Sequence, residues 1–155
     1  MDQKTLKKII FLAVLGILVS AYLLKVHYSE GSQLCDVGDT FSCTDVNNSK
    51  YSQMLGLPVA LYGLLAYFLI GLTAVLRHQK ESWLRSLWAR KIFSSQNLFY
   101  LSFITLIVSL YLTYIEFFII KTLCLFCLIS FGIIILISIY TYKNLKVKKT
   151  VEHSF

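Results

Sequence analysis

The sequence predicts an all-α membrane protein, a four-transmembrane-helix bundle with a long extracytoplasmic loop between helices 1 and 2. Of the 155 residues, 57% are hydrophobic and only 15% are charged, which leaves too little polar surface for a water-soluble protein. Four stretches with almost no charged side chain approach or exceed the roughly 20 residues that span a bilayer. Most basic residues lie in alternate connections between these stretches, as expected for a membrane topology.

A single integral membrane domain is expected over residues 1–155. Its spans are expected at about residues 9–27, 54–76, 92–116 and 122–142, with an outer loop at about 28–53. The first span follows three lysines, as a signal peptide would, but it has no convincing small-x-small cleavage site, so we interpret it as a true span. Its Lys25 is expected to extend its ammonium group to the interface.

Two connections are expected to contain short interfacial helices. Residues 49–57 are predicted to form one before Pro58, which would lie in the opening turn of the second span, where its missing amide proton costs little. Residues 77–91 have Trp and Leu at helical spacing between basic residues, which is typical of an amphipathic membrane anchor.

The distribution of positive charge predicts the orientation. Twelve of the fifteen Lys and Arg residues lie in the two terminal tails and in the connection 77–91. Short loops rich in these residues stay on the cytoplasmic side, so both termini are expected there. The net charge of +7 is explained by this topology and by attraction to anionic lipid, and it requires no nucleic-acid partner.

All four cysteines belong to the outer side of this topology. Cys35 and Cys43 lie in the long loop, and Cys124 and Cys127 lie in the first turns of the fourth span. Buried apolar thiols, structural disulfides and a zinc site are alternatives. A CxxC bridge closes almost no loop and so constrains the unfolded chain little, and the seven residues between the loop cysteines are too many for the usual zinc spacing. We therefore favour redox chemistry.

A helix start suits a reactive sulfur, because unpaired amides and the positive end of the helix dipole favour a thiolate there. Lys121 would add a positive charge nearby. Two cysteine pairs permit a relay by thiol–disulfide exchange, and a pair at the membrane boundary can pass electrons to a lipid-soluble quinone. The candidate aromatic walls of a quinone site are Tyr62, Tyr114, Phe126 and Phe131, although aromatics near an interface are more often belt residues.

Four motifs occur in an order that resembles the vitamin K epoxide reductase (VKOR) family. They are Cys35-Asp-Val-Gly with Cys43, then Ser49, then Gly56-Leu-Pro-Val-Ala60, and then Cys124-Leu-Phe-Cys127. The Gly-Leu-Pro-Val-Ala segment is similar to bacterial members, which oxidise a thioredoxin-like partner and reduce quinone, supporting disulfide formation in exported proteins.

The resemblance implies a role for each cysteine. Cys35 would exchange with the partner, Cys43 would exchange with Cys124, and Cys127 would face the quinone. The quinone is expected to be ubiquinone or menaquinone, and no metal is expected. Ser49 matches the family's loop Ser or Thr. The chain shows no fused thioredoxin-like domain, so a separate periplasmic partner is expected, with the site on the periplasmic side of a bacterial inner membrane.

Two departures from the vertebrate pattern concern the quinone. The second span has no Asn, and Phe131 stands where those enzymes have a Tyr, so the quinone oxygens must be recognised by other groups. A eukaryotic-type vitamin K epoxide reductase is one alternative, and a structural or metal-binding membrane protein with static cysteines is another. A quinone reductase of the disulfide-bond protein B type has its two cysteine pairs in the reverse order.

Overall fold

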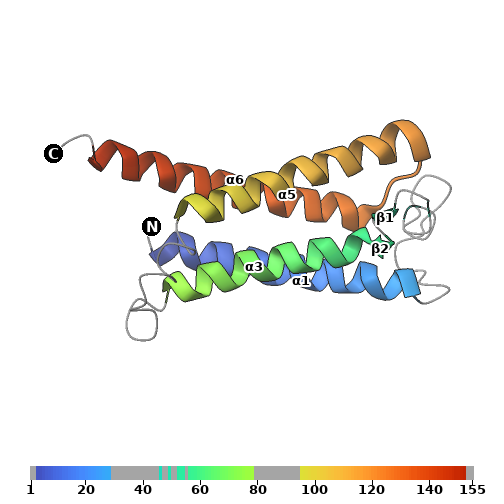
Figure 1. Cartoon of the computed structure of the whole chain (residues 1–155), viewed down its shortest axis with the longest axis horizontal. Coiled ribbons are helices and arrows are strands. Elements are labelled where there is room, and N and C mark those ends of the chain that lie inside the picture. Colours follow the sequence, from blue (N-terminus) through green and yellow to red (C-terminus); the bar gives the residue numbers. More distant parts are fainter. Residues whose placement is uncertain are drawn as a thin grey trace.

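The computed structural model describes residues 3–28, 46, 49, 52–54, 56–78 and 95–152 of the chain. Its long helices are α1 (Gln3–Tyr28), α3 (Val59–His78), α5 (Ser95–Ile115) and α6 (Leu125–Glu152), and α5 continues into a short π-helix, η2 (Glu116–Ile120). They lie side by side as a bundle in which α1 pairs with α3 and α5 pairs with α6 (Figure 1). Each of the four is long and apolar enough to cross a membrane, which confirms the predicted fold class.

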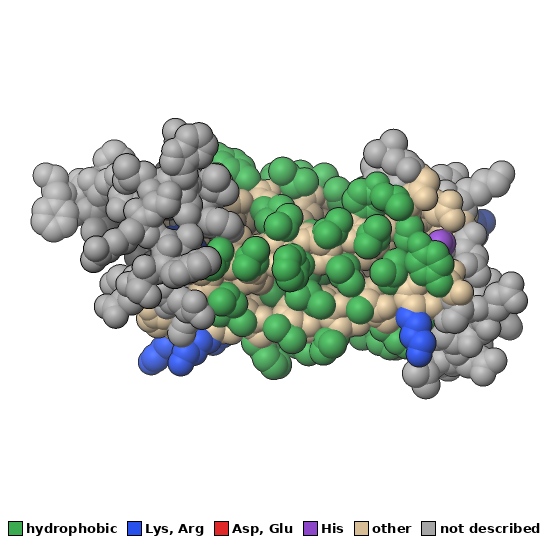
Figure 2. Space-filling view, turned by 60° about the horizontal axis from the view of Figure 1, so that its bottom comes forward, with side chains coloured by type: hydrophobic (Ala, Val, Ile, Leu, Met, Phe, Trp, Pro, Cys, Tyr) green, Lys and Arg blue, Asp and Glu red, His purple; other side chains and the backbone are tan. Residues whose placement is uncertain are grey.

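The surface of the bundle is apolar. Figure 2 shows hydrophobic side chains covering the middle of one face, with Lys and Arg side chains near its ends. Phe11 and Ile104, for example, are 64% and 60% exposed. In a bilayer these side chains contact lipid tails, which are as apolar as the protein interior, so their exposure carries no hydrophobic penalty.

Helices α1 and α3 approach each other through small residues. A Cβ added at Gly63 would lie 3.2 Å from the Ser20 hydroxyl, and one at Gly71 would lie 3.3 Å from the Ala13 side chain. Between these two contacts, the ring of Tyr67 lies directly on Gly16. Close packing of small residues is a main source of helix association in lipid, where no hydrophobic force acts between helices.

Hydroxyl groups connect the other helices. At the α5–α6 contact the hydroxyls of Ser102 and Thr141 are 3.2 Å apart, and Ser138 donates to the Ser102 carbonyl at 3.4 Å. Tyr67 of α3 donates to the Ser130 carbonyl of α6 at 2.8 Å. These bonds satisfy polar groups inside the bundle, and the Tyr67–Ser130 bond joins its two helix pairs.

A β-hairpin precedes α3, so the prediction of a helix over 49–57 is wrong at its C-terminal part. Strand β1 (Gln53–Met54) pairs with β2 (Leu57–Pro58) in antiparallel register, and Gly56 adopts a left-handed conformation with φ of 80°. A right-handed helix cannot continue through such a residue. Pro58 therefore ends the hairpin and directly precedes α3, instead of lying in its first turn. The expected amphipathic stretch over 77–91 lies almost entirely outside the described residues.

Candidate functional site

Cys124 is the N-cap residue of α6. The helix begins at Leu125, the Leu128 amide donates to the Cys124 carbonyl at 3.0 Å, and the Cys127 amide donates to the Cys124 sulfur at 3.3 Å. The sulfur thus takes the place of the oxygen that a Ser, Thr, Asp or Asn cap supplies. A sulfur that receives amide donors at a helix N-terminus is well placed to accept negative charge during thiol–disulfide exchange.

The segment before Cys124 turns the chain sharply. The π-helix η2 ends at Ile120, and its C-cap residue Lys121 has a left-handed backbone with φ of 58°, so that α6 can begin only a few residues later. This conformation at a helix C-cap is usual for Gly or Asn and uncommon for Lys. Lys121 was expected to bring its positive charge toward Cys124. Its side chain is exposed at the end of the bundle.

The turn brings Glu116, the first residue of η2, beside the cysteine pair. Glu116 is only 3% exposed, and its Oε2 accepts a hydrogen bond from the Cys124 amide at 3.3 Å. The Cys127 side chain makes hydrogen bonds with the side chains of both Glu116 and Cys124. A carboxyl and two thiols therefore form one cluster at the start of α6.

The sequence interpretation counted Glu116 only as one of the acidic residues of the outer side. A signal was nevertheless present. Glu116 is the only acidic residue between Glu81 and Glu152, and it ends an apolar span. An ionisable residue within a membrane span is a candidate functional residue by default.

Cys124 is fully buried. It packs in a cluster with Leu23 of α1 and with Val46, which follows Cys43 by three residues in the outer loop. The described part of the loop next to Cys43 therefore contacts Cys124. Cys35 and Cys43 themselves lie outside the described residues.

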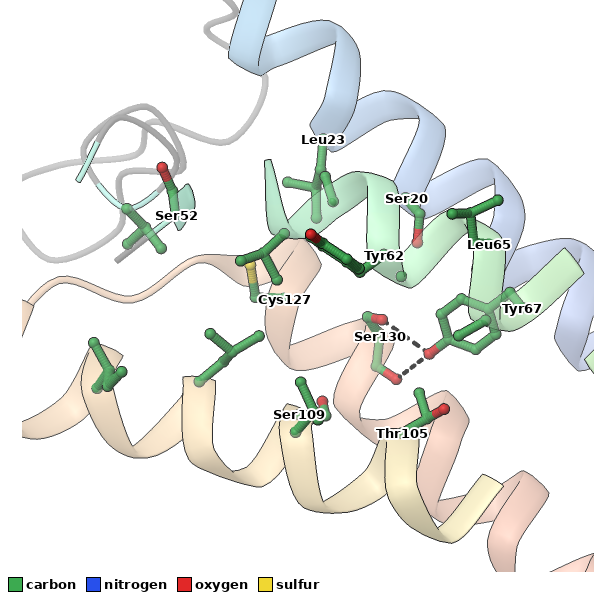
Figure 3. Close-up of a pocket in the computed structure, with 18 of the residues that line it drawn as sticks. Ser20, Leu23, Ser52, Tyr62, Leu65, Tyr67, Thr105, Ser109, Cys127 and Ser130 are labelled. Atoms are coloured by element: carbon green, nitrogen blue, oxygen red, sulfur yellow. Dashed lines mark hydrogen bonds between the residues drawn. The ribbon is translucent and has the colours of Figure 1, made fainter. Parts of the chain in front are cut away.

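Cys127 lies in the wall of a cavity of about 390 Å³ that is bounded by all four long helices and the outer loop (Figure 3). Its volume is in the range of small-molecule binding sites. Most of the wall is apolar, with hydroxyl groups at intervals. The hydroxyl-bearing residues are Ser20, Ser49, Ser52, Tyr62, Tyr67, Thr105, Ser109 and Ser130.

The structure brings only part of the predicted quinone site to this cavity. Ser49 and Tyr62 line it together with Cys127. Ser49 also donates from its hydroxyl to the Val46 carbonyl at 2.8 Å, so it fixes the turn that contacts Cys124. This hydrogen bond matches the turn-stabilising role that is the simplest explanation of a loop serine.

The other three predicted aromatic residues are not among the lining residues of the cavity. The ring of Phe126 packs on Tyr22 of α1, with centroids 4.6 Å apart. Phe131 packs against the hydrophobic core in the middle of the bundle. Tyr114 is 55% exposed and stacks on Phe118 at 4.7 Å. Tyr114 thus has the position of a belt or lipid-facing residue, and the two Phe residues have packing positions.

No group of three or more His, Cys, Asp or Glu residues capable of holding a metal occurs within the described parts of the chain. A comparison with protein-family profiles matched residues 7–142 to the profile described as the vitamin K epoxide reductase family. The match runs from the second turn of α1 to the middle of α6, and so includes α3, α5, the outer loop and both cysteine pairs.

Proposed function

Because the chain belongs to the vitamin K epoxide reductase family, whose members are membrane oxidoreductases, we propose that it is a thiol:quinone oxidoreductase. In this proposal, electrons pass from a separate thioredoxin-like partner to Cys35 and Cys43, then to Cys124 and Cys127, and finally to ubiquinone or menaquinone. The reaction drives disulfide formation in exported proteins.

The observation that carries this proposal is the different environment of the two CxxC thiols. Cys127 lies in the wall of a largely apolar cavity between the membrane-spanning helices. Cys124 is buried against Val46 of the outer loop, on the route by which electrons would arrive from Cys43. One thiol thus meets the loop, and the other meets a space that a lipid-soluble ring can enter.

The cavity wall also supplies groups for recognising a quinone. The oxygens of a quinone accept hydrogen bonds, and Tyr62 and Ser109 present hydroxyls to the cavity from opposite helix pairs (Figure 3). These hydroxyls can make the polar contacts with the quinone that an Asn and a Tyr make in the vertebrate enzymes. Tyr67 is less suited to this role, because its hydroxyl is already bonded to Ser130.

The proposal includes a location. The two termini lie at one end of the bundle, and the start of α6 lies at the other (Figure 1). With the basic tails and the connection 77–91 on the cytoplasmic side, the cysteines reach the periplasmic side of a bacterial inner membrane, where disulfides form.

The test uses the purified full-length protein in detergent with quinone and a reduced thioredoxin-like protein. Quinone absorbance is expected to fall with wild type and to stay constant with Cys127→Ser. Thr113→Val is the matched control, because within the described residues the Thr113 hydroxyl bonds to the Ser109 carbonyl of its own helix, and Thr113 is not among the residues that line the cavity. No quinone reduction by wild type, or full activity of Cys127→Ser, would refute the proposal.

Two further readouts test the order of the cysteines. Without Cys35, the mixed disulfide that forms when Cys43 attacks the Cys124–Cys127 bond has no Cys35 thiol to complete the exchange, so it is expected to accumulate in Cys35→Ser and to appear in non-reduced peptide mass spectra. Cys35→Ser is expected to block electron entry from the partner while small thiols still reduce the CxxC. Equal loss of activity with both reductants would contradict this division of roles.

A further inference from the structure

Glu116 is a buried carboxyl for which the four-cysteine relay has no role. It is 3% exposed and lines the same cavity as Cys127. In the part of the chain that the structure describes, it makes hydrogen bonds to Cys124 and Cys127 but has no Lys, Arg or His partner. A buried carboxyl without a cation is costly to the fold, so its position at the cysteine pair suggests a function in the reaction.

The contacts of Glu116 place it between the two thiols and the cavity. Its Oε2 is held by the Cys124 amide at 3.3 Å, and the carboxyl is hydrogen-bonded to the Cys127 side chain. A carboxyl within hydrogen-bond reach of a reacting thiol can accept its proton as the sulfur reacts. Because Glu116 also lines the cavity, the same group can deliver that proton to a molecule bound there.

The proposed reaction requires such a carrier. Oxidation of Cys124 and Cys127 breaks two S–H bonds, forms one S–S bond and releases two electrons and two protons, and a quinone must gain two of each to become a hydroquinone. Resting on this proposed function, we infer that Glu116 accepts the proton of the Cys127 thiol and passes it to a quinone oxygen. The Cys124 proton leaves to water, and the second quinone oxygen takes a proton from water.

Other titratable groups around Glu116 are less suited to this step. Helix α6 contributes the Cys127 thiol to the cavity wall, and α3 contributes Tyr62 and Tyr67. The Tyr67 hydroxyl is bonded to Ser130, and Lys121 at the end of η2 is exposed. The parts of α1 and the outer loop that line the cavity contribute only Ser, Leu and Val side chains. Tyr62 is therefore the main competitor, and Tyr62→Phe is included as a comparison.

The experiment compares wild type with Glu116→Gln, Glu116→Asp and the control Thr113→Val, all as full-length protein reduced by dithiothreitol. Glutamine keeps an oxygen that can accept the Cys124 amide but cannot take up a proton. At neutral pH, kcat for quinone reduction by Glu116→Gln is expected to fall about 100-fold, the usual scale of acid–base catalysis, with little change in KM. Glu116→Asp is expected to recover part of the rate.

The pH profile separates proton transfer from a structural role. The activity of wild type is expected to fall as pH falls and Glu116 becomes protonated. The defect of Glu116→Gln is expected to shrink at alkaline pH, where hydroxide can deprotonate the thiol directly. The inference is overturned by a Glu116→Gln profile parallel to that of wild type, by a loss confined to KM, or by a larger fall in kcat in Tyr62→Phe than in Glu116→Gln.

A measurement without quinone keeps this inference distinct from the proposed function. The rate at which iodoacetamide alkylates Cys127, read by mass spectrometry, is expected to be slower in deuterium oxide than in water for wild type, because a proton moves to Glu116 as the sulfur reacts, and to show no such solvent isotope effect in Glu116→Gln. If wild type fails to reduce quinone, the proposed function fails, and the isotope effects on alkylation still decide whether Glu116 takes the proton. Equal isotope effects in the two proteins would refute this role.

Discussion

Gly16→Ala tests the idea that close packing of α1 on α3 stabilises the bundle. The added Cβ would lie 2.5 to 2.6 Å from three ring carbons of Tyr67, whereas ordinary contact begins at 3.4 Å, so the ring must move by about 1 Å. Tyr67 has little freedom to do so. It is 2% exposed, and its hydroxyl is bonded to Ser130 at 2.8 and 2.9 Å.

The expected loss of stability combines three effects. Overpacking of this kind costs about 1–3 kcal/mol. Loss of the Tyr67–Ser130 hydrogen bond adds about 0.6 kcal/mol, the average for such bonds between membrane helices. The preference of helices for Ala over Gly returns up to about 1 kcal/mol. Gly16→Ala is therefore expected to lower the free energy of unfolding by about 1–3 kcal/mol.

Gly132→Ala is the matched control, because Gly132 also lies in a membrane-spanning helix but an added Cβ meets nothing within 4 Å. It is expected to be neutral or slightly stabilising. The assay is unfolding in a detergent and SDS mixture, followed by circular dichroism. Equal stability of the two variants would refute the packing argument, as would an undiminished effect of Gly16→Ala in a Tyr67→Leu background, where the ring is absent.

Two further predictions concern other contacts. Ser102→Ala removes the 3.2 Å contact with Thr141, which links α5 to α6. In the same unfolding assay, this substitution is expected to lower the free energy of unfolding by only about 0.6 kcal/mol. A loss as large as that of Gly16→Ala would contradict this ranking. Gly56→Ala places a side chain at φ of 80° with no clash, so the strain of about 1–2 kcal/mol falls on the hairpin. It is expected to lower the rate of quinone reduction while leaving the unfolding of the helices nearly unchanged. An unchanged rate would show that the hairpin does not position Ser52 and the cavity wall.

The fold was predictable because the hydropathy and the length of a segment together determine whether it crosses a membrane as a helix. An apolar segment of about 20 residues must form a helix in lipid, since its backbone polar groups have no water to bond to. The hairpin at residues 53–58 was harder to foresee. The polar segment before Pro58 is compatible with either a helix or a turn, and the backbone of Gly56 decides between them.

The identity of the cavity wall was much less predictable. In a soluble helix, apolar residues mark the buried face, but in a membrane helix both the lipid-facing and the inward faces are apolar. Sequence spacing therefore could not distinguish Tyr62, which lines the cavity, from Tyr114, which is exposed. Proximity to the CxxC also did not show whether Phe126 lines the cavity, and its ring packs on Tyr22 of α1.

The start of α6 has residues that are better explained by a reaction than by the stability of the fold. An N-cap position is best filled by Asn, Asp, Ser or Thr, whose oxygens accept amide hydrogen bonds more strongly than a thiol does. Cys124 makes this contact at 3.3 Å with a weaker acceptor. A serine would satisfy the helix at least as well, so capping does not explain a cysteine at this position.

Glu116 presents a similar case, because a glutamine could accept the same hydrogen bond from the Cys124 amide without burying an ionisable group. At both positions the chain has a residue that serves the fold less well than an available alternative, and each such residue can exchange a proton beside the Cys127 thiol.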